Sequence, residues 1–289
     1  FKIYNFIMRL ISFYKISKII KPDLIISFTE SANFVGIFSS LFSGTLNKTI
    51  ISVRVAPERF KIITKLLILL FYRLPYKIVA PSEGIKKTLQ KYGLPKKKLE
   101  FIPNPVSMIS NIKKKSRLNE SLIKKEFILA AGRLEYQKGF DILIKSFSKI
   151  NDKKIKLVIL GDGSLKYRLI ELAKKEKIES DRIMLPGAVE DISIWFKKAK
   201  FFILSSRYEG WPNVLMESLA NGCPAIAFDC KHGPREIINN FKNGILVQPE
   251  DENQLTETIN VLNSSNTMQR TFKKNGYQTA KKYESGIIA

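Results

Sequence analysis

The stretch that decides the fold is Phe201-Phe202-Ile203-Leu204-Ser205-Ser206-Arg207-Tyr208-Glu209-Gly210-Trp211-Pro212-Asn213-Val214-Leu215-Met216-Glu217-Ser218-Leu219-Ala220-Asn221-Gly222. Residues 201–206 form a short apolar run that predicts a buried parallel strand. Helical spacing of apolar residues predicts a helix over 213–220, with Pro212 at its start and Gly222 after its end. Glu209 then lies on the loop and Glu217 lies two turns into the helix. Two carboxylates beside a free helix N-terminus can bind hydroxyl and phosphate groups together.

The residues before this stretch alternate between helix and strand patterns from the start of the chain. In the first part we expect strands over 24–28, 50–53 and 77–80, and an extended stretch over 99–106. The expected helices are a basic one with an apolar face over 1–20, one that ends at Leu41, one around 66–72 and one over 81–92. A loop over 29–33 is expected to lead to the helix that ends at Leu41. This alternation predicts a parallel sheet covered by helices. Ligands of such sheets bind beyond the C-terminal ends of the strands.

The pattern restarts after a polar, lysine-rich linker predicted over 108–125. In this part we expect strands over 127–131, 156–160, 183–187, 225–228 and 245–247, and helices that end at Ile150 or cover 165–176, 191–198, 250–262 and 268–283, with a short helix from Gly233. The predicted domains are therefore 1–107 and 126–266, followed by a C-terminal helical segment over 267–289, which the family resemblance described below implies to be a helix that crosses back to the first domain.

The charge of the chain predicts an anionic partner. Its 289 residues include 49 Lys and Arg against 26 Asp and Glu, a net charge of +23. Residues 1–107 hold 18 of the basic and 5 of the acidic side chains. A membrane surface, a nucleic acid or a phosphorylated substrate would each fit this balance, and so would a lysine-rich solvated surface.

Metal, redox and membrane-spanning signals are weak in the sequence. Cys223 and Cys230 flank a predicted core strand and are expected to be buried thiols. The single histidine, His232, excludes a site with several histidines, and no Asp-x-Asp motif is present. The longest apolar run, 66–72, is too short to span a bilayer, which needs about 20 residues. No signal peptide is visible.

The Glu-x7-Glu pattern of Glu209 and Glu217 resembles the motif of the family-4 retaining glycosyltransferases, also called glycosyl transferases group 1. The resemblance covers nearly the whole chain and is densest over 127–247. It implies an α/β GT-B fold with two Rossmann-like domains that face a cleft. Family members open with a strand and a glycine-rich loop, and they often have a histidine in the first domain. This chain has none of these, so the first domain is expected to be incomplete. Either the sequence is a fragment, which we favour, or this half is degenerate.

The resemblance also implies a donor site. Gly132, Arg133 and Lys138 match the loop that binds the diphosphate, where fixed cations stabilise the charge that develops on the leaving group. A surface pair between Arg133 and Glu135 is the structural alternative. The backbone N–H groups of Asn213, Val214 and Leu215 would add to phosphate binding. Glu217 matches the position that binds the ribose hydroxyls, and Glu209 matches the position beside the donor sugar, with a role in orientation and charge stabilisation. Val189 lies in the loop that matches the one framing the base.

Three residues of the first domain follow predicted strands and are candidate acceptor contacts, with roles as caps or surface charges as the alternative. These are Glu30, Asn33 and Arg54. The segment 232–236 resembles a Gly-Pro-x-Glu-Ile variant of members that build bacterial surface glycans. A subset of those members adds N-acetylgalactosamine or related sugars to acceptors linked to polyprenyl diphosphate.

The sequence thus predicts a retaining transferase that moves a sugar from a UDP-sugar to a lipid-linked saccharide. We expect no metal and no other cofactor, no nucleic-acid partner, and a cytoplasmic location peripheral on the inner face of the cytoplasmic membrane. The alternative is a Rossmann-like module that binds an anionic membrane or nucleic acid without catalysis. A nicotinamide dehydrogenase is disfavoured, because Lys166 stands where its fingerprint after Gly161 and Gly163 needs a glycine.

Overall fold

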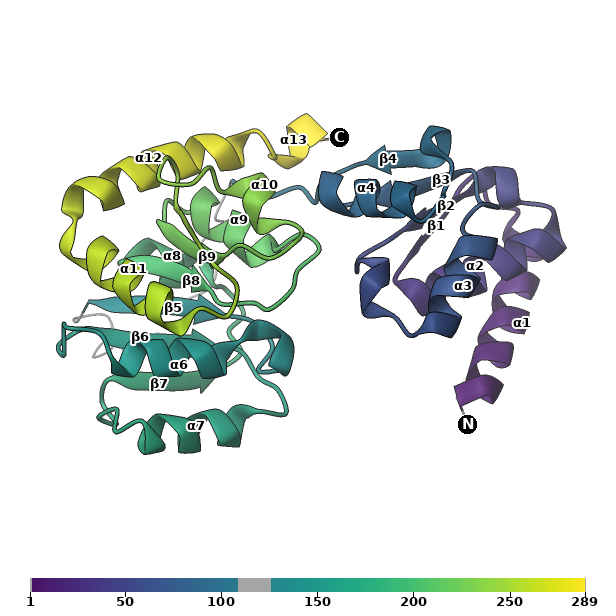
Figure 1. Ribbon diagram of the computed structural model, residues 1–289. Coiled ribbons are helices and arrows are strands. Elements are labelled where there is room, and N and C mark those ends of the chain that lie inside the picture. Colours follow the sequence, from purple (N-terminus) through teal and green to yellow (C-terminus); the bar gives the residue numbers. More distant parts are fainter. Residues whose placement is uncertain (1, 109–125, 289) are drawn as a thin grey trace. The chain divides into compact units, whose positions relative to one another are not determined.

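The computed structural model describes residues 2–108 and 126–288 (Figure 1). The chain divides into two compact units, Phe1–Pro103 and Asn104–Ala289. The boundary lies close to the predicted end of the first domain at residue 107. Apart from Met108, the predicted linker lies outside the described residues. The predicted C-terminal helix is part of the second unit.

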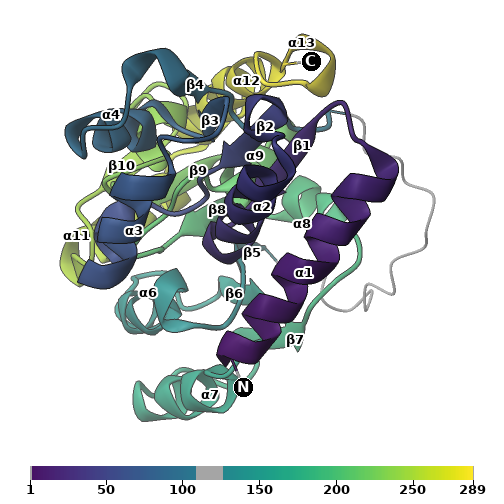
Figure 2. The same cartoon turned by 90° about the vertical axis from the view of Figure 1, so that its right-hand side faces the viewer.

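The first unit contains a parallel sheet with the strand order β1-β2-β3-β4. Its strands are β1 (Ile25–Phe28), β2 (Thr49–Ser52), β3 (Lys77–Ala80) and β4 (Leu99–Phe101), and its helices are α1 (Lys2–Ile20), α2 (Glu30–Ser43), α3 (Ile62–Phe71) and α4 (Glu83–Lys91). Side chains of α2, α3 and α4 share one buried cluster with β2 and β3, which includes Ile37, Ile51, Ile68, Ile78 and Ile85. Helix α1 packs against α2 (Figure 2). Between them, Ser39 Oγ donates to the carbonyl of Leu10 at 3.1 Å.

One predicted boundary in this unit is wrong. The expected loop over 29–33 is absent, and α2 already begins at Glu30. Thr29 has φ 74°, so the chain turns directly from β1 into the helix, and the N–H of Asn33 donates to the carbonyl of Thr29 at 2.8 Å. Sequence patterning missed this start because a threonine with positive φ is uncommon.

The second unit contains a parallel sheet with the order β10-β9-β8-β5-β6-β7 in the part of the chain that the structure describes. Its strands are β5 (Phe127–Ala131), β6 (Lys156–Leu160), β7 (Ile183–Gly187), β8 (Phe201–Leu204), β9 (Ala225–Phe228) and β10 (Ile245–Val247). On one side of β5 the sheet continues through β6 to β7, and on the other side it continues through β8 and β9 to β10. The switch point of this open α/β sheet therefore lies between β5 and β8, where such sheets bind ligands.

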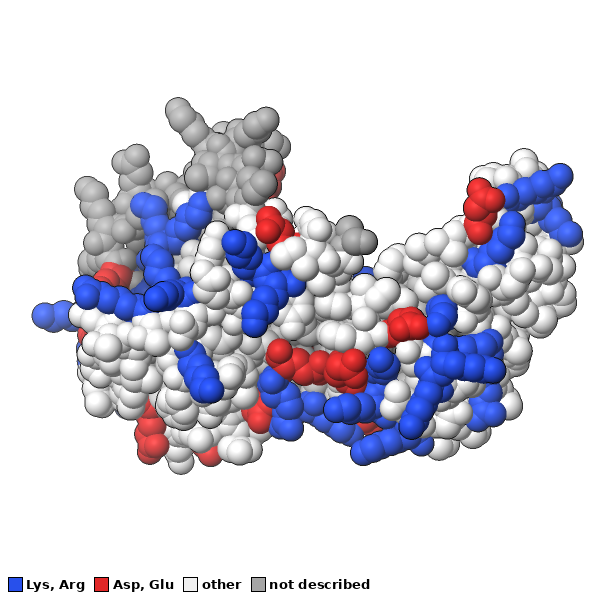
Figure 3. All heavy atoms as spheres, turned by 90° about the horizontal axis from the view of Figure 1, so that it is seen from above, with Lys and Arg blue, Asp and Glu red and all other residues white. Residues whose placement is uncertain are grey.

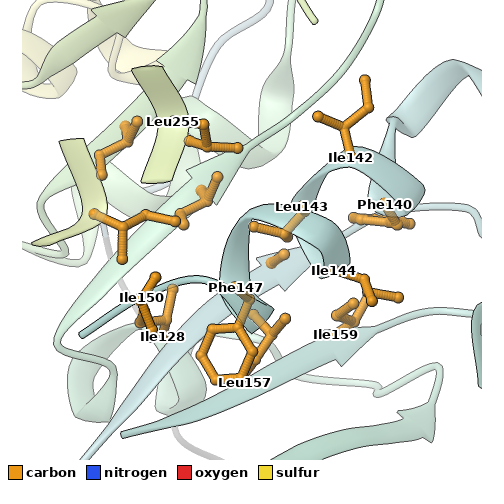
Figure 4. Packing of buried hydrophobic residues seen from close by; sticks show 14 of the residues in the cluster. Ile128, Phe140, Ile142, Leu143, Ile144, Phe147, Ile150, Leu157, Ile159 and Leu255 are labelled. Carbon is orange, nitrogen blue, oxygen red and sulfur yellow. The ribbon is translucent and has the colours of Figure 1, made fainter. Parts of the chain in front are cut away.

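Helices pack on this sheet through a large apolar core. They are α6 (Phe140–Ser148), α7 (Lys166–Lys175), α8 (Ser193–Lys198), α9 (Asn213–Ala220), α10 (Pro234–Ile237), α11 (Glu252–Ser264) and α12 (Asn266–Lys281). The short helix α13 (Ser285–Ile288) follows α12 and has no buried residue. Figure 4 shows Leu143 and Phe147 of α6 beside Ile128 of β5 and Leu157 of β6. Strands β5, β8 and β9 are buried along their whole length, which explains why each is a continuous apolar run rather than an alternating one.

Helix α12 packs against α9. Gly276 of α12 faces Leu219 of α9, where an added Cβ would lie 2.9 Å from a Leu219 methyl group. At the end of α12 the carbonyl of Tyr283 accepts from the N–H of Val106 at 2.8 Å, and the Tyr283 ring lies 5.3 Å from that of Trp211. These contacts fix the helix that carries Glu217 within the second unit.

Candidate active site

Two loops meet at the switch point of the second sheet. One follows β5 and covers 132–139, and the other follows β8 and covers 205–212. Gly139 has φ 61°, and a Cβ at this position would overlap the carbonyl oxygen of Ser205. Ser205 Oγ in turn donates to the carbonyl of Lys138 at 2.8 Å. The two loops can approach this closely only because residue 139 is a glycine with the conformation that glycine tolerates.

This contact brings together two of the predicted catalytic residues. Lys138 Nζ lies 2.6 Å from Glu209 Oε1, and the two side chains are only 14% and 7% exposed. The methylene groups of Lys138 lie against Gly132, where a side chain would displace them. A largely buried ion pair therefore stands at the C-terminal edge of the sheet, with the cation and the carboxylate on different loops.

Arg133 lies on the same loop as Lys138 and is exposed. Its Nη2 donates to Gln137 Oε1 at 3.3 Å. The carboxylate of Glu135, the alternative partner, is hydrogen-bonded by the N–H and the hydroxyl of Ser164, both at 2.9 Å. These two bonds are the main reason that the pKa of Glu135 lies below its usual value. The Arg133 guanidinium thus hydrogen-bonds to Gln137, while its charge also contributes to the lowered pKa of Glu135.

Helix α9 begins at the switch point with Pro212 as its N-cap residue. The N–H of Leu215 donates to the carbonyl of Pro212 at 3.0 Å, and the Leu215 side chain is fully buried. This corrects the prediction for Leu215, because its N–H group is already used inside the helix end. Asn213 and Val214 occupy the first helical positions, whose N–H groups have no partner within a helix.

Glu217 lies one turn further along α9 and is partly buried. Burial raises the pKa of its carboxyl group. Within 2–108 and 126–288, no residue hydrogen-bonds to this carboxylate. A desolvated carboxylate of this kind is suited to accept hydrogen bonds from hydroxyl groups of a ligand.

The loop that contains Val189 is held by an aspartate that the sequence did not single out. Asp162 Oδ2 accepts from the N–H of Ala188 at 3.1 Å, and Asp162 Oδ1 lies 3.0 Å from Lys166 Nζ. The hydrogen bond from Lys166 is the largest cause that lowers the pKa of Asp162. Gly161 lies so close to Gly132 that a Cβ would overlap the Gly132 carbonyl oxygen. The loops after β5, β6 and β7 are thus connected at one edge of the sheet.

The three candidate acceptor residues of the first unit differ in their surroundings. Glu30 opens α2 and burial raises its pKa, whereas Arg54 follows β2 with its Cζ 4.8 Å from the ring centroid of Phe28. Asn33 is fully buried, and its side chain accepts from Ser27 Oγ at 2.9 Å and donates to the Ser52 carbonyl at 3.0 Å. The prediction for Asn33 is corrected, since its amide links the ends of β1 and β2 instead of facing a ligand.

The two cysteines are structural groups of the second unit. Cys223 and Cys230 are unpaired and buried, as predicted, and burial raises the pKa of Cys230 to about 12. The Cys230 thiol donates to the carbonyl of Ser206 at 2.8 Å, so it supports the loop after β8. Over the described ranges, no group of three or more His, Cys, Asp or Glu is arranged to hold a metal ion.

Family comparisons cover both units. Residues 110–279 match the family model described as glycosyl transferases group 1, and residues 2–108 match the one described as glycosyltransferase family 4. The chain is 30% identical over 287 residues to the amylovoran biosynthesis glycosyltransferase AmsD of Erwinia amylovora, covering 98% of this chain and 80% of AmsD. It is 28% identical over 270 residues to N-acetylgalactosamine-N,N'-diacetylbacillosaminyl-diphospho-undecaprenol 4-alpha-N-acetylgalactosaminyltransferase of Campylobacter jejuni, covering 91% of this chain and 73% of the relative.

Solved structures agree with this assignment at the level of the fold. Alr3699/HepE from Anabaena in complex with UDP superposes with a TM-score of 0.85 at 19% identity, covering 96% of this chain and 79% of that one. Sucrose-phosphate synthase from Thermosynechococcus elongatus gives a TM-score of 0.83 at 17% identity, covering 96% and 74%. With two Rossmann-like parallel sheets and family-model matches over both units, the chain belongs to the glycosyl transferases group 1 family and is a glycosyltransferase of the GT-B fold.

Proposed function

We propose that this protein is a retaining glycosyltransferase that moves a sugar from a UDP-sugar to a lipid-linked saccharide. The observation that carries the proposal is the Lys138–Glu209 ion pair at the switch point, 2.6 Å long and shielded from solvent. Arg133 and the open N-terminus of α9 stand at the same strand edge. A set of two cations, a helix N-terminus and a carboxylate suits a diphosphate that leaves a sugar.

The donor would be bound mainly through its nucleotide. Arg133 and Lys138 would hold the diphosphate, with the N–H groups of Asn213 and Val214 as further donors. Glu217 would accept hydrogen bonds from the two ribose hydroxyls, and the loop with Val189 would frame the base. Charge on the bridging oxygen grows as the bond to the sugar breaks, so the same cations stabilise the transition state more than the bound donor.

Retention of configuration follows if the acceptor attacks from the face that the diphosphate leaves. The bond between the anomeric carbon and the phosphate oxygen breaks, and the acceptor oxygen bonds to the same carbon on the same face. The acceptor's proton passes to an oxygen of the departing diphosphate, so all atoms and charges balance without a metal ion. Glu209, held by Lys138, would orient the sugar and stabilise positive charge on its ring.

The identities of the donor and the acceptor rest on the relatives. Alr3699/HepE was crystallised with UDP, and the C. jejuni enzyme is named for a diphospho-undecaprenol acceptor and an N-acetylgalactosaminyl group. We therefore propose N-acetylgalactosamine or another hexose or N-acetylhexosamine as the sugar, in bacterial surface glycan or glycoprotein glycan synthesis. Glu30 and Arg54 remain the proposed acceptor contacts.

A lipid-linked acceptor requires access to a membrane surface, and the first unit has features that fit this. Large apolar side chains are exposed on α1, among them Tyr4, Ile7, Ile11, Ile16 and Ile19, and on α3, where they are Ile62, Ile63, Leu66, Leu67 and Leu70. Lys and Arg side chains are prominent on the face of this unit seen in Figure 3. We propose peripheral binding to the cytoplasmic face of the membrane. Within 2–108 and 126–288, no helix is both long and apolar enough to cross a bilayer.

The proposal is tested by incubating the purified protein with several UDP-sugars and a short-chain polyprenyl-diphosphate saccharide. We expect transfer from at least one UDP-sugar, with the same anomeric configuration in donor and product by NMR coupling constants. Lys138→Ala and Glu209→Gln variants serve as controls for background transfer. An inverted product would refute the retaining mechanism, and activity with another nucleotide-sugar alone would refute the UDP assignment.

A further inference from the structure

Arg207 contacts two carboxylates, a carbonyl group and an aromatic ring at the switch point, although the donor site as described makes no use of it. It follows β8 and is only 8% exposed. Its Nη1 and Nη2 lie 2.9 and 2.7 Å from the two carboxylate oxygens of Asp141, in the first turn of α6. Its Nε donates to Glu250 Oε2 at 2.9 Å, and Nη1 also donates to the carbonyl of Tyr136 at 2.8 Å.

These contacts join three loops that follow different strands. Tyr136 and Asp141 belong to the segment after β5, Glu250 to the segment after β10, and Arg207 to the loop after β8. The Arg207 Cζ atom also lies 4.0 Å from the ring centroid of Tyr136, in a cation–π contact. Because Arg has a planar fork of donors, one side chain can hold all of these partners in a fixed geometry.

The anchors of Arg207 lie immediately around the catalytic ion pair. Tyr136 and Asp141 flank Lys138 in sequence, and Arg207 is two residues before Glu209. Two further hydrogen bonds join the same loops: the backbone N–H of Arg207 donates to the Gln137 carbonyl at 2.8 Å, and the side-chain Nε2 of Gln137 donates to the Tyr208 carbonyl at 3.0 Å. The loops that carry Lys138 and Glu209 are therefore joined by one network.

We propose that Arg207 is a positioning residue for the transfer reaction, which acts by fixing the loops after β5 and β8 so that Lys138 and Glu209 stay aligned. This inference rests on the proposed roles of those two residues. Misplacement of catalytic groups by about 1 Å costs on the order of 10²-fold in rate. Loss of the Arg207 fork should therefore reduce kcat more than it weakens donor binding, because Glu217 and the N-terminus of α9 would still hold the nucleotide when Lys138 and Glu209 lose their alignment.

The test compares Arg207→Met and Arg207→Lys with a matched buried arginine elsewhere in the unit. Arg182 is 6% exposed, donates to the carbonyls of Ile155 and Asp152, and lies 4.9 Å from the ring centroid of Phe147. It directly precedes β7 and so stands at the opposite edge of the sheet. Arg182→Met should therefore lower thermal stability in a similar way without touching the site.

For each variant, kcat and KM for the donor are measured well below the melting temperature, and the Kd for UDP is measured by calorimetry. We expect Arg207→Met to lower kcat by roughly 10- to 100-fold with the Kd within about 3-fold of the unchanged protein. Arg207→Lys should stay impaired, since one ammonium cannot reproduce the fork. Arg182→Met should keep its kcat.

A normal kcat in folded Arg207→Met, or an equal loss of kcat in Arg182→Met, would overturn the inference. If Arg207→Met does not fold, Asp141→Asn removes the charge of the main partner at constant size and is read in the same way. The Lys138→Ala and Glu209→Gln variants distinguish a failure of the proposed chemistry from a failure of the positioning role of Arg207. Should both be fully active, the proposed chemistry fails; should they be impaired while Arg207→Met is normal, only the positioning role fails.

Discussion

At the scale of single residues, Glu217 offers the most direct test of donor binding. Burial raises the pKa of its carboxyl group, so it takes up a proton at a higher pH than an ordinary glutamate. The folded protein binds this proton more tightly than the unfolded chain does, and protonation therefore adds stability as the pH falls. The same proton removes the charge that strengthens hydrogen bonds to ribose hydroxyls.

We therefore expect the affinity for a UDP-sugar to fall as the pH is lowered through the raised pKa of Glu217. Glu217→Gln should bind the donor more weakly by roughly 1–2 kcal/mol at neutral pH, with little dependence on pH in this range. Calorimetric titration of both proteins with a UDP-sugar across the acid range checks this. Identical titrations of both proteins would give Glu217 a purely structural role.

The two cations of the loop after β5 allow a second prediction. Arg133→Ala and Lys138→Ala should each lower turnover by on the order of 10²-fold, comparable to the loss of an oxyanion donor. Arg133 is exposed, so its replacement should leave the melting temperature almost unchanged. Steady-state assays with the best UDP-sugar give the result, and near-normal turnover of both variants would contradict the phosphate-binding role.

Gly139 gives a prediction on stability. A methyl group there would overlap the Ser205 carbonyl, and the residue has φ 61°. Gly222 has a similar φ of 68°, but its added Cβ would meet the flexible side chain of Lys273 at 3.2 Å. Gly222→Ala should therefore cost about 1 kcal/mol for the backbone conformation alone, and Gly139→Ala should cost more. Urea unfolding of both variants measures the difference in the free energy of unfolding. Equal losses of stability would mean that the loops after β5 and β8 can move apart without cost.

At the scale of elements, the basic side chains of α1 allow a test of the proposed binding to a membrane surface. Arg9, Lys15 and Lys18 lie on this helix together with its exposed apolar side chains. Each Lys or Arg near an anionic surface contributes about 1 kcal/mol to binding, and salt screens this over roughly 10 Å. We expect the protein to bind liposomes that contain anionic lipid at low salt, to leave them at high salt, and to bind neutral liposomes poorly.

Replacing Arg9, Lys15 and Lys18 with Glu should weaken this binding and leave the Kd for UDP unchanged. Reversal of Lys153, Lys154 and Lys175 in the second unit changes the net charge by the same amount and serves as the control. Sedimentation with vesicles measures both triple variants. Equal binding by the unchanged protein and the α1 variant would mean that the charge is only a solvated surface.

The elements themselves were largely predictable, and the site only in part. Buried parallel strands and α9 follow from apolar runs and from Pro and Gly at their ends, which are local signals. Asn33 and Arg207 show what local patterns cannot predict, because each side chain bonds to residues far away in the sequence. The main partner of Arg207 is 66 positions away and Glu250 is 43 away, so only the strand order brings them together. Such distant contacts determine which polar side chains hydrogen-bond within the fold and which stay available to a ligand.

At the scale of the whole molecule, the composition predicts independence from metal ions. The chain has one histidine and no Asp-x-Asp motif, and the proposed transfer uses Arg133, Lys138 and α9 to stabilise the diphosphate. Transfer should persist in excess EDTA at an unchanged rate, measured with dialysed protein and substrates. Complete loss of activity that Mg²⁺ or Mn²⁺ restores would contradict this mechanism.

The boundary between Pro103 and Asn104 bears on how such enzymes diversify. Every residue proposed to bind the donor follows this boundary, and every residue proposed to contact the acceptor precedes it. A single recombination event near this position could therefore pair an existing nucleotide-sugar preference with a new acceptor, without rebuilding either hydrophobic core. Inherited in this way, donor choice and acceptor choice would evolve as separate traits within one gene.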